Sequence, residues 1–478
     1  MREQNILIKP FEFTNLLSID AKLEANEHGI LNASMYIQKE KAEEYLEMAL
    51  KDTWVDVVLL EENKEEITLF LGLLTNLEIY FENELCKMDI ELKTGSYLMD
   101  LNIHTRTFQT SGLLYKNLLE TCKSEYENSN FIMTVGKDTS INKFVLQYKE
   151  TDWSFIKRLA SHFESVLFPD YKVGGSRYYF GIPTYSEERD FTGKTYSISK
   201  DFKEYGEKTG LGLKGVYEQD FTYYIFKSRE VYRLADIFKV MGNKLYICKI
   251  ETVFDGSELY HTYYMKKENG FKVPKDYSES LLGASLEANI TNVTSDVVQI
   301  SILEDENKDK CGSRWFPYST VYSTPDGTGW YSMPEIGDSV RLYMPTEDEA
   351  EAYVISSTHL QVSEESKNPD IGDNRRSNPD FKSIMNKQGK EVLFTPNSLI
   401  ITNNKGMSVE IVDDEGITII SNKDITLKAE QNIMIASATE NIDIIAPKGI
   451  NIIQGESGET FHKLEDNAYL SSEQIHLN

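Results

Sequence analysis

The chain has 478 residues and carries 77 acidic against 50 basic side chains, which gives a formal net charge of −27. This length provides for about three domains of ~100–200 residues each. The acidic balance argues against nucleic acid as a partner because contacts with phosphate need a basic surface. No apolar run approaches the length of a membrane span.

The ends of the chain and its cysteines indicate where it is made. Residues 1–9 lack the apolar region of a secretory signal peptide. The four cysteines are scattered and form no CxxC pair (Cys86, Cys122, Cys248 and Cys311). We therefore expect reduced structural thiols and assembly in the cytoplasm, with any later exit independent of a signal peptide.

Residues 1–110 are predicted to be β-rich with one helical interruption. The strand-like runs, which are rich in β-branched and aromatic residues or alternate in polarity, cover 5–8, 33–38, 54–60, 68–73 and 88–92. Residues 40–50 are rich in Ala, Glu, Leu and Met and predict a helix.

Two further helices follow. In residues 111–126, Leu114, Leu118 and Cys122 recur at i, i+4 spacing and predict an amphipathic helix. Residues 150–163 predict a second helix, with Thr151 as its N-cap and an apolar face that includes Trp153. A strand is expected between them at 143–148.

The chain then returns to strands. Residues 178–270 are dense in aromatic residues and predict further β structure. Residues 272–279 contain Pro and polar side chains and mark a boundary, and a compact β segment follows at 285–361. Residues 363–383 are rich in Asn, Asp and Pro and predict a connector.

The C-terminal region repeats a short motif. Each repeat, or rung, opens with Gly, Asp or Asn and then alternates apolar and polar residues. The leading isoleucines, spaced by eight, eight, nine and eight residues, are Ile417, Ile425, Ile433, Ile442 and Ile450. We call this segment the ladder. Its period and alternation predict strands separated by turns in a repeat architecture.

A rung of four or five residues cannot bury its isoleucines alone. Three octads could form one coil of a single-chain β-helix, but residues 398–454 would give only two or three coils with open edges. If three chains wind around a common axis, the isoleucines fill one shared core. We therefore predict an intertwined trimer, with a small single-chain β-sandwich as the alternative.

Two stretches resemble a known family. Residues 146–160 read Leu-Gln-Tyr-Lys-Glu-Thr-Asp-Trp-Ser-Phe-Ile-Lys-Arg-Leu-Ala. They resemble the strand-to-helix segment of the VgrG and phage tail hub-and-spike family. Residues 329–343, with Pro334 and Gly337-Asp338 at a turn, look like the OB-fold segment that follows the hub in these proteins. The order of the segments also agrees with the family, although its needles often repeat Val-x-Gly where this chain has Ile-x-Ile-Ile.

The resemblance implies a mainly β protein with minor α content. It implies a hub domain at 1–275 with two β-barrel subdomains plus helices, an OB-fold domain at 280–362, a connector at 363–390 and a trimeric β-helical or β-prism needle at 391–478. The helix at Trp153 would either buttress the hub ring at a subunit contact or lie in the core of one domain.

The function implied by the resemblance is that of a structural, non-enzymatic spike in a contractile injection machine. Such a machine could be a phage tail, a tailocin, an extracellular particle or a type VI-like system. The expected partners are two further copies of the chain, an Hcp-like tube protein, baseplate proteins, a PAAR-like tip protein or effector, and the target cell envelope. The particle would be translocated into or through that envelope on contraction.

No catalytic, cofactor or metal site can be predicted. The seven histidines are dispersed and show no zinc-binding spacing, and no nucleophile-elbow, Walker or dinucleotide pattern occurs. His462 and His476 lie near the expected tip, where three copies could hold a metal, but a solvated tail is the simpler interpretation. The alternatives to a spike are a tail-associated polysaccharide or cell-wall hydrolase and an adhesive fibre, although no catalytic domain or bulky head is visible.

Overall fold

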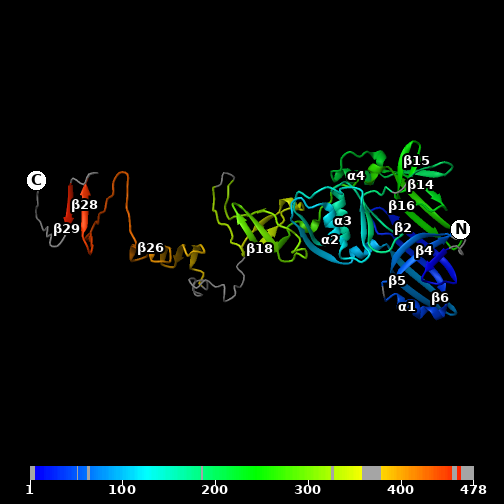
Figure 1. Ribbon diagram of the computed structural model, residues 1–478, viewed down its shortest axis with the longest axis horizontal. Coiled ribbons are helices and arrows are strands. Elements are labelled where there is room, and N and C mark those ends of the chain that lie inside the picture. The colour runs from blue at the N-terminus through cyan, green and yellow to red at the C-terminus, as the bar shows by residue number, and fades with distance from the viewer. Residues whose placement is uncertain are drawn as a thin grey trace. The chain divides into compact units, whose positions relative to one another are not determined.

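The computed structural model describes residues 6–50, 52–61, 65–184, 187–324, 328–357, 378–454 and 460–464, the last two ranges with side chains only up to residue 450. The chain is mainly β with a few short helices, which confirms the predicted fold class (Figure 1). It divides into two compact units, Met1–Gln361 and Val362–Asn478. None of the described helices is long and apolar enough to cross a membrane.

A twelve-stranded sheet, here the large sheet, dominates the first unit. Its first half contains β1 (Ile6–Lys9), β2 (Asn15–Glu24), β3 (Ile30–Ile37), β4 (Trp54–Leu60), β5 (Glu66–Glu82) and β6 (Leu85–Lys93). Its second half contains β12 (Glu188–Asp190), β13 (Tyr196–Lys200), β14 (Thr222–Ser228), β15 (Ile237–Val240), β16 (Asn243–Phe254) and β17 (Leu259–Lys266). In strands such as β3, buried residues alternate with more exposed ones, so one face of the strand enters the core.

The two halves are continuous. Strand β2 pairs antiparallel with β16 from Lys249–Glu24 to Phe254–Ile19, which links the order β1-β4-β5-β6-β3-β2 to β16-β17-β14-β13. Among the described residues no strand pairing closes either half on itself. The long-range pairing of β2 with β16 thus joins the two halves, where two β-barrel subdomains are expected, into one continuous sheet.

Two short helices accompany this sheet. Helix α1 (Ala42–Met48) buries Ala42 and Tyr45 and lies within the predicted helical stretch at 40–50. Helix α4 (Phe202–Gly210) was not predicted, because its surroundings are dominated by strand-like aromatic residues.

A helical region, residues 95–183, interrupts the large sheet in sequence. It contains β7 (Ile103–Phe108), α2 (Tyr115–Lys123), β8 (Asn130–Met133), β9 (Val145–Thr151), α3 (Asp152–Ser161), β10 (Leu167–Pro169) and β11 (Arg177–Phe180). Thr151 accepts a hydrogen bond from the amide of Ser154 (3.2 Å), which confirms it as the N-cap of α3. The apolar face of α3, including Trp153 and Phe155, is buried in the core of this region, so contacts within one chain account for the helix.

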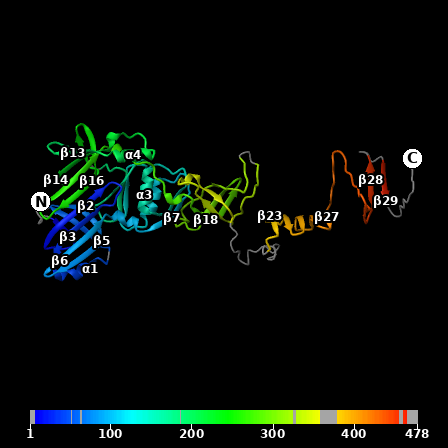
Figure 2. The same ribbon diagram turned by 180° about the vertical axis from the view of Figure 1, so that it is seen from behind.

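Five strands after the helical region form a small barrel. They are β18 (Ser285–Thr294), β19 (Val297–Ile302), β20 (Phe316–Pro317), β21 (Ser339–Tyr343) and β22 (Tyr353–Ile355). Their order is β20-β19-β18-β21-β22, and a parallel bridge between Tyr318 and Val354 brings the two ends together. The turn before β21 has Gly337 at φ 96°, a left-handed conformation that favours glycine. In both views α2 and α3 lie between the large sheet and β18 (Figures 1 and 2).

The second unit begins with an antiparallel meander. Its strands are β23 (Lys382–Met385), β24 (Glu391–Thr395), β25 (Ser398–Thr402), β26 (Met407–Val412) and β27 (Gly416–Ser421), paired in sequence order. We expected the segment 363–390 to be a connector. Strand β23 lies inside this segment, and its residues pair with β24. A separate hairpin joins β28 (Ile450–Gln454) to β29 (Thr460–Leu464).

The ladder is only partly paired in the single chain. Its first rung is β27 and its last rung is β28, whereas residues 422–449 form no strand. The isoleucines of the middle rungs are exposed, from 48% for Ile442 to 91% for Ile445. In the described part of this unit Leu393 is the only buried apolar side chain. The alternative of a self-contained β-sandwich therefore does not describe this chain.

Candidate functional site

The most highly organised polar cluster of the first unit lies where the barrel meets the helical region. We call it the joint. Strand β7 pairs with β9 along one edge, and the loop between β19 and β20 binds along it from the barrel side. Buried charged side chains connect the two parts, although burying a charge is costly unless the charge is paired.

Arg106 on β7 forms the first buried ion pair. Its Nη1 lies 2.6 Å from Asp152 Oδ1 at the start of α3, and both residues are at most 2% exposed. Gln147 donates to the same Asp152 oxygen (2.9 Å) and accepts from Arg106 Nη1 (3.2 Å). The hydroxyl of Tyr126 donates to the second carboxylate oxygen of Asp152 (2.8 Å). Burial would lower the pKa of Arg106, but the charge of Asp152 raises it, so the guanidinium stays charged.

The barrel loop adds carboxylates to the same strand. Asp305 accepts from the amide of Thr107 (3.0 Å), and Glu306 accepts from the amide of Thr105 (3.0 Å). His104 Nδ1 lies 2.7 Å from Glu306 Oε2. Carboxylates of the barrel loop therefore accept hydrogen bonds from the backbone amides at the outer edge of β7, as the carbonyl groups of a neighbouring strand would.

Arg158 on α3 forms the second ion pair of the joint and is 2% exposed. Its Nη1 donates to Glu349 of the barrel (2.6 Å), its Nη2 donates to Glu150 (2.9 Å), and Nη2 also donates to the carbonyl of Leu146 (2.8 Å). Burial would lower the pKa of Arg158, but the two carboxylates raise it. Burial raises the pKa of Glu150. The charge of Arg158 lowers it in part, and the nearby charge of Glu349 raises it.

Apolar packing reinforces these pairs. Leu146 from β9 and Phe144, which precedes β9, are buried in the core of the barrel, and the rings of Phe144 and Phe316 meet edge to face at 5.1 Å. At the rim, Lys143 Nζ lies 2.7 Å from Asp348 Oδ1. The predicted domain boundary near residue 280 is thus crossed by one continuous core, and the helical region and the barrel form one packed body.

A backbone irregularity positions the polar side chains. The pairing of β7 with β9 shifts register between His104 and Thr105, and Lys149 takes a positive φ of 48°. Such a bulge re-aims the side chains that follow it. Gln147 accepts a hydrogen bond from Arg106, whereas Glu150 accepts one from Arg158.

The joint was not predicted as a site, although five of its residues lie in the 146–160 motif. Those residues are Gln147, Glu150, Thr151, Asp152 and Arg158. The available signal was a charged residue on an apolar helical stripe: Asp152 and Arg158 each lie three residues from Phe155. The joint can hold two bodies rigidly together.

The two histidines considered for metal binding are not tested by the structure. His462 lies on β29, whose side chains are not described, and His476 lies outside the described residues. In the part of the chain that the structure describes, no group of three His, Cys, Asp or Glu side chains could hold a metal ion. The four cysteines are free and buried, as expected for structural thiols.

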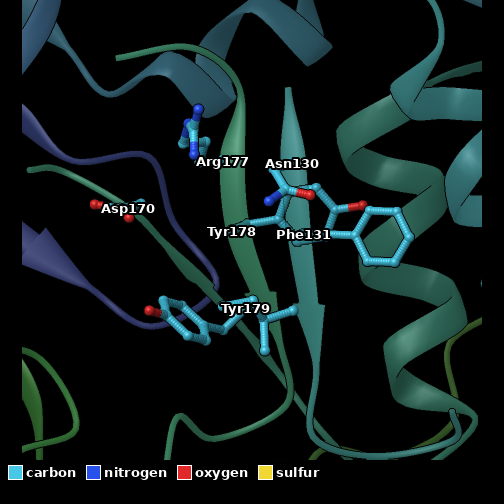
Figure 3. Close-up of a pocket in the computed structure, with 7 residues that line it drawn as sticks. Asn130, Phe131, Asp170, Arg177, Tyr178 and Tyr179 are labelled. Atoms are coloured by element: carbon cyan, nitrogen blue, oxygen red, sulfur yellow. The ribbon is translucent and has the colours of Figure 1, made fainter. Parts of the chain in front are cut away.

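A small cavity lies between β8 and β11 (Figure 3). Asn130 and Phe131 come from β8, Tyr178 and Tyr179 come from β11, and Asp170 follows β10. Its volume of about 40 Å³ has room for a water molecule but not for a sugar or a peptide.

No protein-family model and no curated protein sequence matches the chain. Solved structures do match it. One is the E. coli c3393 protein, described as a component of the type VI secretion system with structural similarity to the T4 bacteriophage tail proteins gp27 and gp5. It is 10% identical, with a TM-score of 0.52 over 73% of this chain and 98% of that chain. Another is the Francisella PdpA-VgrG complex in its half-lidded form, which is 11% identical, with a TM-score of 0.54 over 87% of both chains. The chain thus has the fold of the VgrG-type hub-and-spike proteins.

Proposed function

We propose that this chain is the structural spike of a contractile injection machine and acts as a homotrimer. The fold shared with VgrG-type proteins supports the general assignment. The trimer, and with it the needle, rests on the chain's own ladder.

The observation that carries the proposal is the uncovered ladder. Four apolar side chains of the middle rungs, Ile425, Leu427, Ile433 and Ile435, are between 54% and 68% exposed in the single chain. Burying apolar area contributes roughly 25 cal/mol per Å², so a repeated apolar face of this length favours association. Three copies around one axis would cover the faces of all three and would also remove the open strand edges.

The barrel supports the same assignment. Numbered along the chain, its strands follow the circular order 1-2-3-5-4-1. We assign it as an OB-fold, a five-stranded Greek-key barrel. Its acidic surroundings suit a structural collar better than an oligonucleotide site.

The joint has a mechanical role in this proposal. Thrust applied to the large sheet must reach the barrel through the helical region. At the joint, a buried network of ion pairs and a continuous apolar core resist shear and separation of these two parts. The proposed role is therefore structural and not enzymatic. The proposed partners are a tube protein above, baseplate proteins around, and a tip protein or effector below. The spike would assemble in the cytoplasm and reach the target envelope on contraction.

The test is the mass of the purified chain by light scattering coupled to size exclusion. A stable particle of three times 54.9 kDa is expected. A monomer at all concentrations, with the ladder resistant to proteolysis, would contradict the proposal, because a lone chain would then protect its own isoleucines.

A further inference from the structure

A second, larger cavity lies in the first unit and is lined in part by Tyr126. Its volume is about 450 Å³, within the range of ligand-binding clefts. The large sheet contributes Trp54 and Leu73, and the helical region contributes Leu98, Leu101 and the loop that follows α2. The cavity thus lies between two parts of the unit, where binding sites often occur.

The floor of the cavity is built by close backbone packing. A Cβ on Gly175 (φ 90°) would lie 2.3 Å from the carbonyl oxygen of Asn128, and a Cβ on Gly95 would lie 2.1 Å from the carbonyl oxygen of Gly175. Both positions therefore require glycine. The ring of Trp54 lies directly against this floor, 2.7 Å from the same Gly95 position.

The walls are fixed as well. The hydroxyl of Tyr126 is held by Asp152 (2.8 Å), so its ring cannot swing into the cavity without breaking the joint. Leu73 is 7% exposed, whereas Leu101 at the mouth is 54% exposed and its neighbour Ile103 is 66% exposed. The mouth thus offers apolar surface beside a pre-formed opening.

The charge at the mouth has one sign. Asp52, Glu125 and Glu127 line the cavity, and none of the described residues that line it is basic. Glu125 lies 3.6 Å from Arg106 Nη2. Asp52 and Glu127 form no ion pair with any described residue. Carboxylates beside an indole face match an ammonium or guanidinium group, which gains both ion pairing and cation–π contact.

We propose that this cavity is a docking site for an arginine or lysine side chain carried by an exposed segment of a partner protein. The basic group enters between Trp54 and the carboxylates of Asp52 and Glu127. The apolar residues on either side of it cover Leu101 and Ile103. The site is separate from the ladder and from the assembly role proposed above, so it stands even if the trimer does not.

The experiment is isothermal titration calorimetry of the full-length chain with the blocked pentapeptide Ala-Leu-Arg-Leu-Ala at low salt. A second peptide replaces arginine by citrulline, which has nearly the same shape without the charge. We expect the arginine peptide to bind on the order of tenfold more tightly than the citrulline peptide, because a charged hydrogen-bonded contact is lost. Its affinity should fall as salt is added.

The matched variants are D52N/E127Q and E82Q/E84Q. The first removes the two unpaired carboxylates and leaves Glu125 beside Arg106. The second removes two exposed charges at the turn between β5 and β6. D52N/E127Q should weaken binding of the arginine peptide about tenfold, whereas E82Q/E84Q should not.

Three results would overturn the proposal. They are equal affinity for the arginine and citrulline peptides, no measurable binding by the wild type, and unchanged affinity in D52N/E127Q. If arginine ethyl ester alone bound as tightly as the peptide, the occupant would be a small amine and the docking of a protein segment would be excluded. The mass of the particle is measured in parallel, so a failure of the trimer is recognised separately.

Discussion

The first unit buries some of its charged residues, whereas the second unit leaves many of its apolar residues exposed. In the first unit even arginines are buried, because Arg106 and Arg158 find carboxylates inside the same chain. In the second unit the isoleucines of the ladder remain exposed. The described residues of a single chain thus complete the core of the first unit, whereas they leave the ladder of the second unit uncovered.

This contrast separates two kinds of mutational effect. Changes in the joint should alter the stability of one chain, since every partner is internal. Changes in the ladder should alter association and leave the first unit folded. The predictions below test this separation, starting with the largest expected effect.

The largest effect is expected from charge on the ladder. In I433D/I442D, two side chains that are 54% and 48% exposed in the single chain become acidic. A lone chain would tolerate this within about 0.5 kcal/mol, but carboxylates in a shared core would cost several kcal/mol each. Light scattering should therefore show a fall from three times 54.9 kDa to one.

The control for the ladder is T426D, which places a carboxylate on the polar face of a rung. Its mass should stay that of the wild type. If I433D/I442D also kept the wild-type mass, the ladder isoleucines would not lie at a shared interface.

The next largest effect is expected from R158M in the joint. It leaves Glu150 and Glu349 without their shared guanidinium, and breaking such a buried pair costs about 3–5 kcal/mol. Urea unfolding followed by tryptophan fluorescence should show an earlier first transition. The particle mass below that transition should be unchanged.

A rescue variant distinguishes lost charge pairing from lost volume. R158M/E150Q/E349Q removes the unpaired carboxylates and should recover part of the stability. A triple variant that is less stable than R158M would show that the carboxylates have other partners more important than Arg158.

Mild acid should weaken the first unit. Burial lowers the pKa of His261 to about 4 and that of His162 to about 3. The unfolded chain binds these protons near pH 6.5 and the folded chain does not, so stability is lost as pH falls from 6.5 towards 4. For His261, which is 2% exposed, the loss at pH 5 is about 2 kcal/mol.

The measurement is urea unfolding at pH 7 and pH 5 for the wild type and H261Q. The variant should lose about 2 kcal/mol less of its stability across this interval. Residues 378–450 contain no histidine, so the mass of the particle should persist at pH 5. Equal pH dependence in both proteins would exclude a buried neutral His261.

Local patterns were sufficient to predict the local elements. Residues 54–60 form β4 with the predicted bounds, and Thr151 caps α3 as its hydroxyl and position required. The rungs at Ile417 and Ile450 begin as strands. Long-range pairings could not be predicted in this way. The sequences of β2 and β16 are each typical of a strand, but neither contains a pattern that predicts their pairing.

The joint was missed for a related reason. Arg106 lies between Thr105 and Thr107 in β7, so no apolar alternation marks it as a buried residue. Its burial depends on Asp152, which only the pairing of β7 with β9 brings near. Helix α4 was missed because strand-like aromatic residues surround it, and Gly206 and Gly210 further weaken its helical pattern.

The smallest effect is expected from a change at the junction of β9 and α3 in the joint. T151A removes the hydroxyl that accepts from the amide of Ser154 and donates to Asp100. Loss of an N-cap costs about 1 kcal/mol, and T151S should restore most of it because serine keeps the acceptor. Both variants should form particles of wild-type mass, since Thr151 contacts only its own chain. A change of mass in T151A with T151S normal would mean that α3 also lies at a contact between copies, and the division between internal stability and association would then run through the joint.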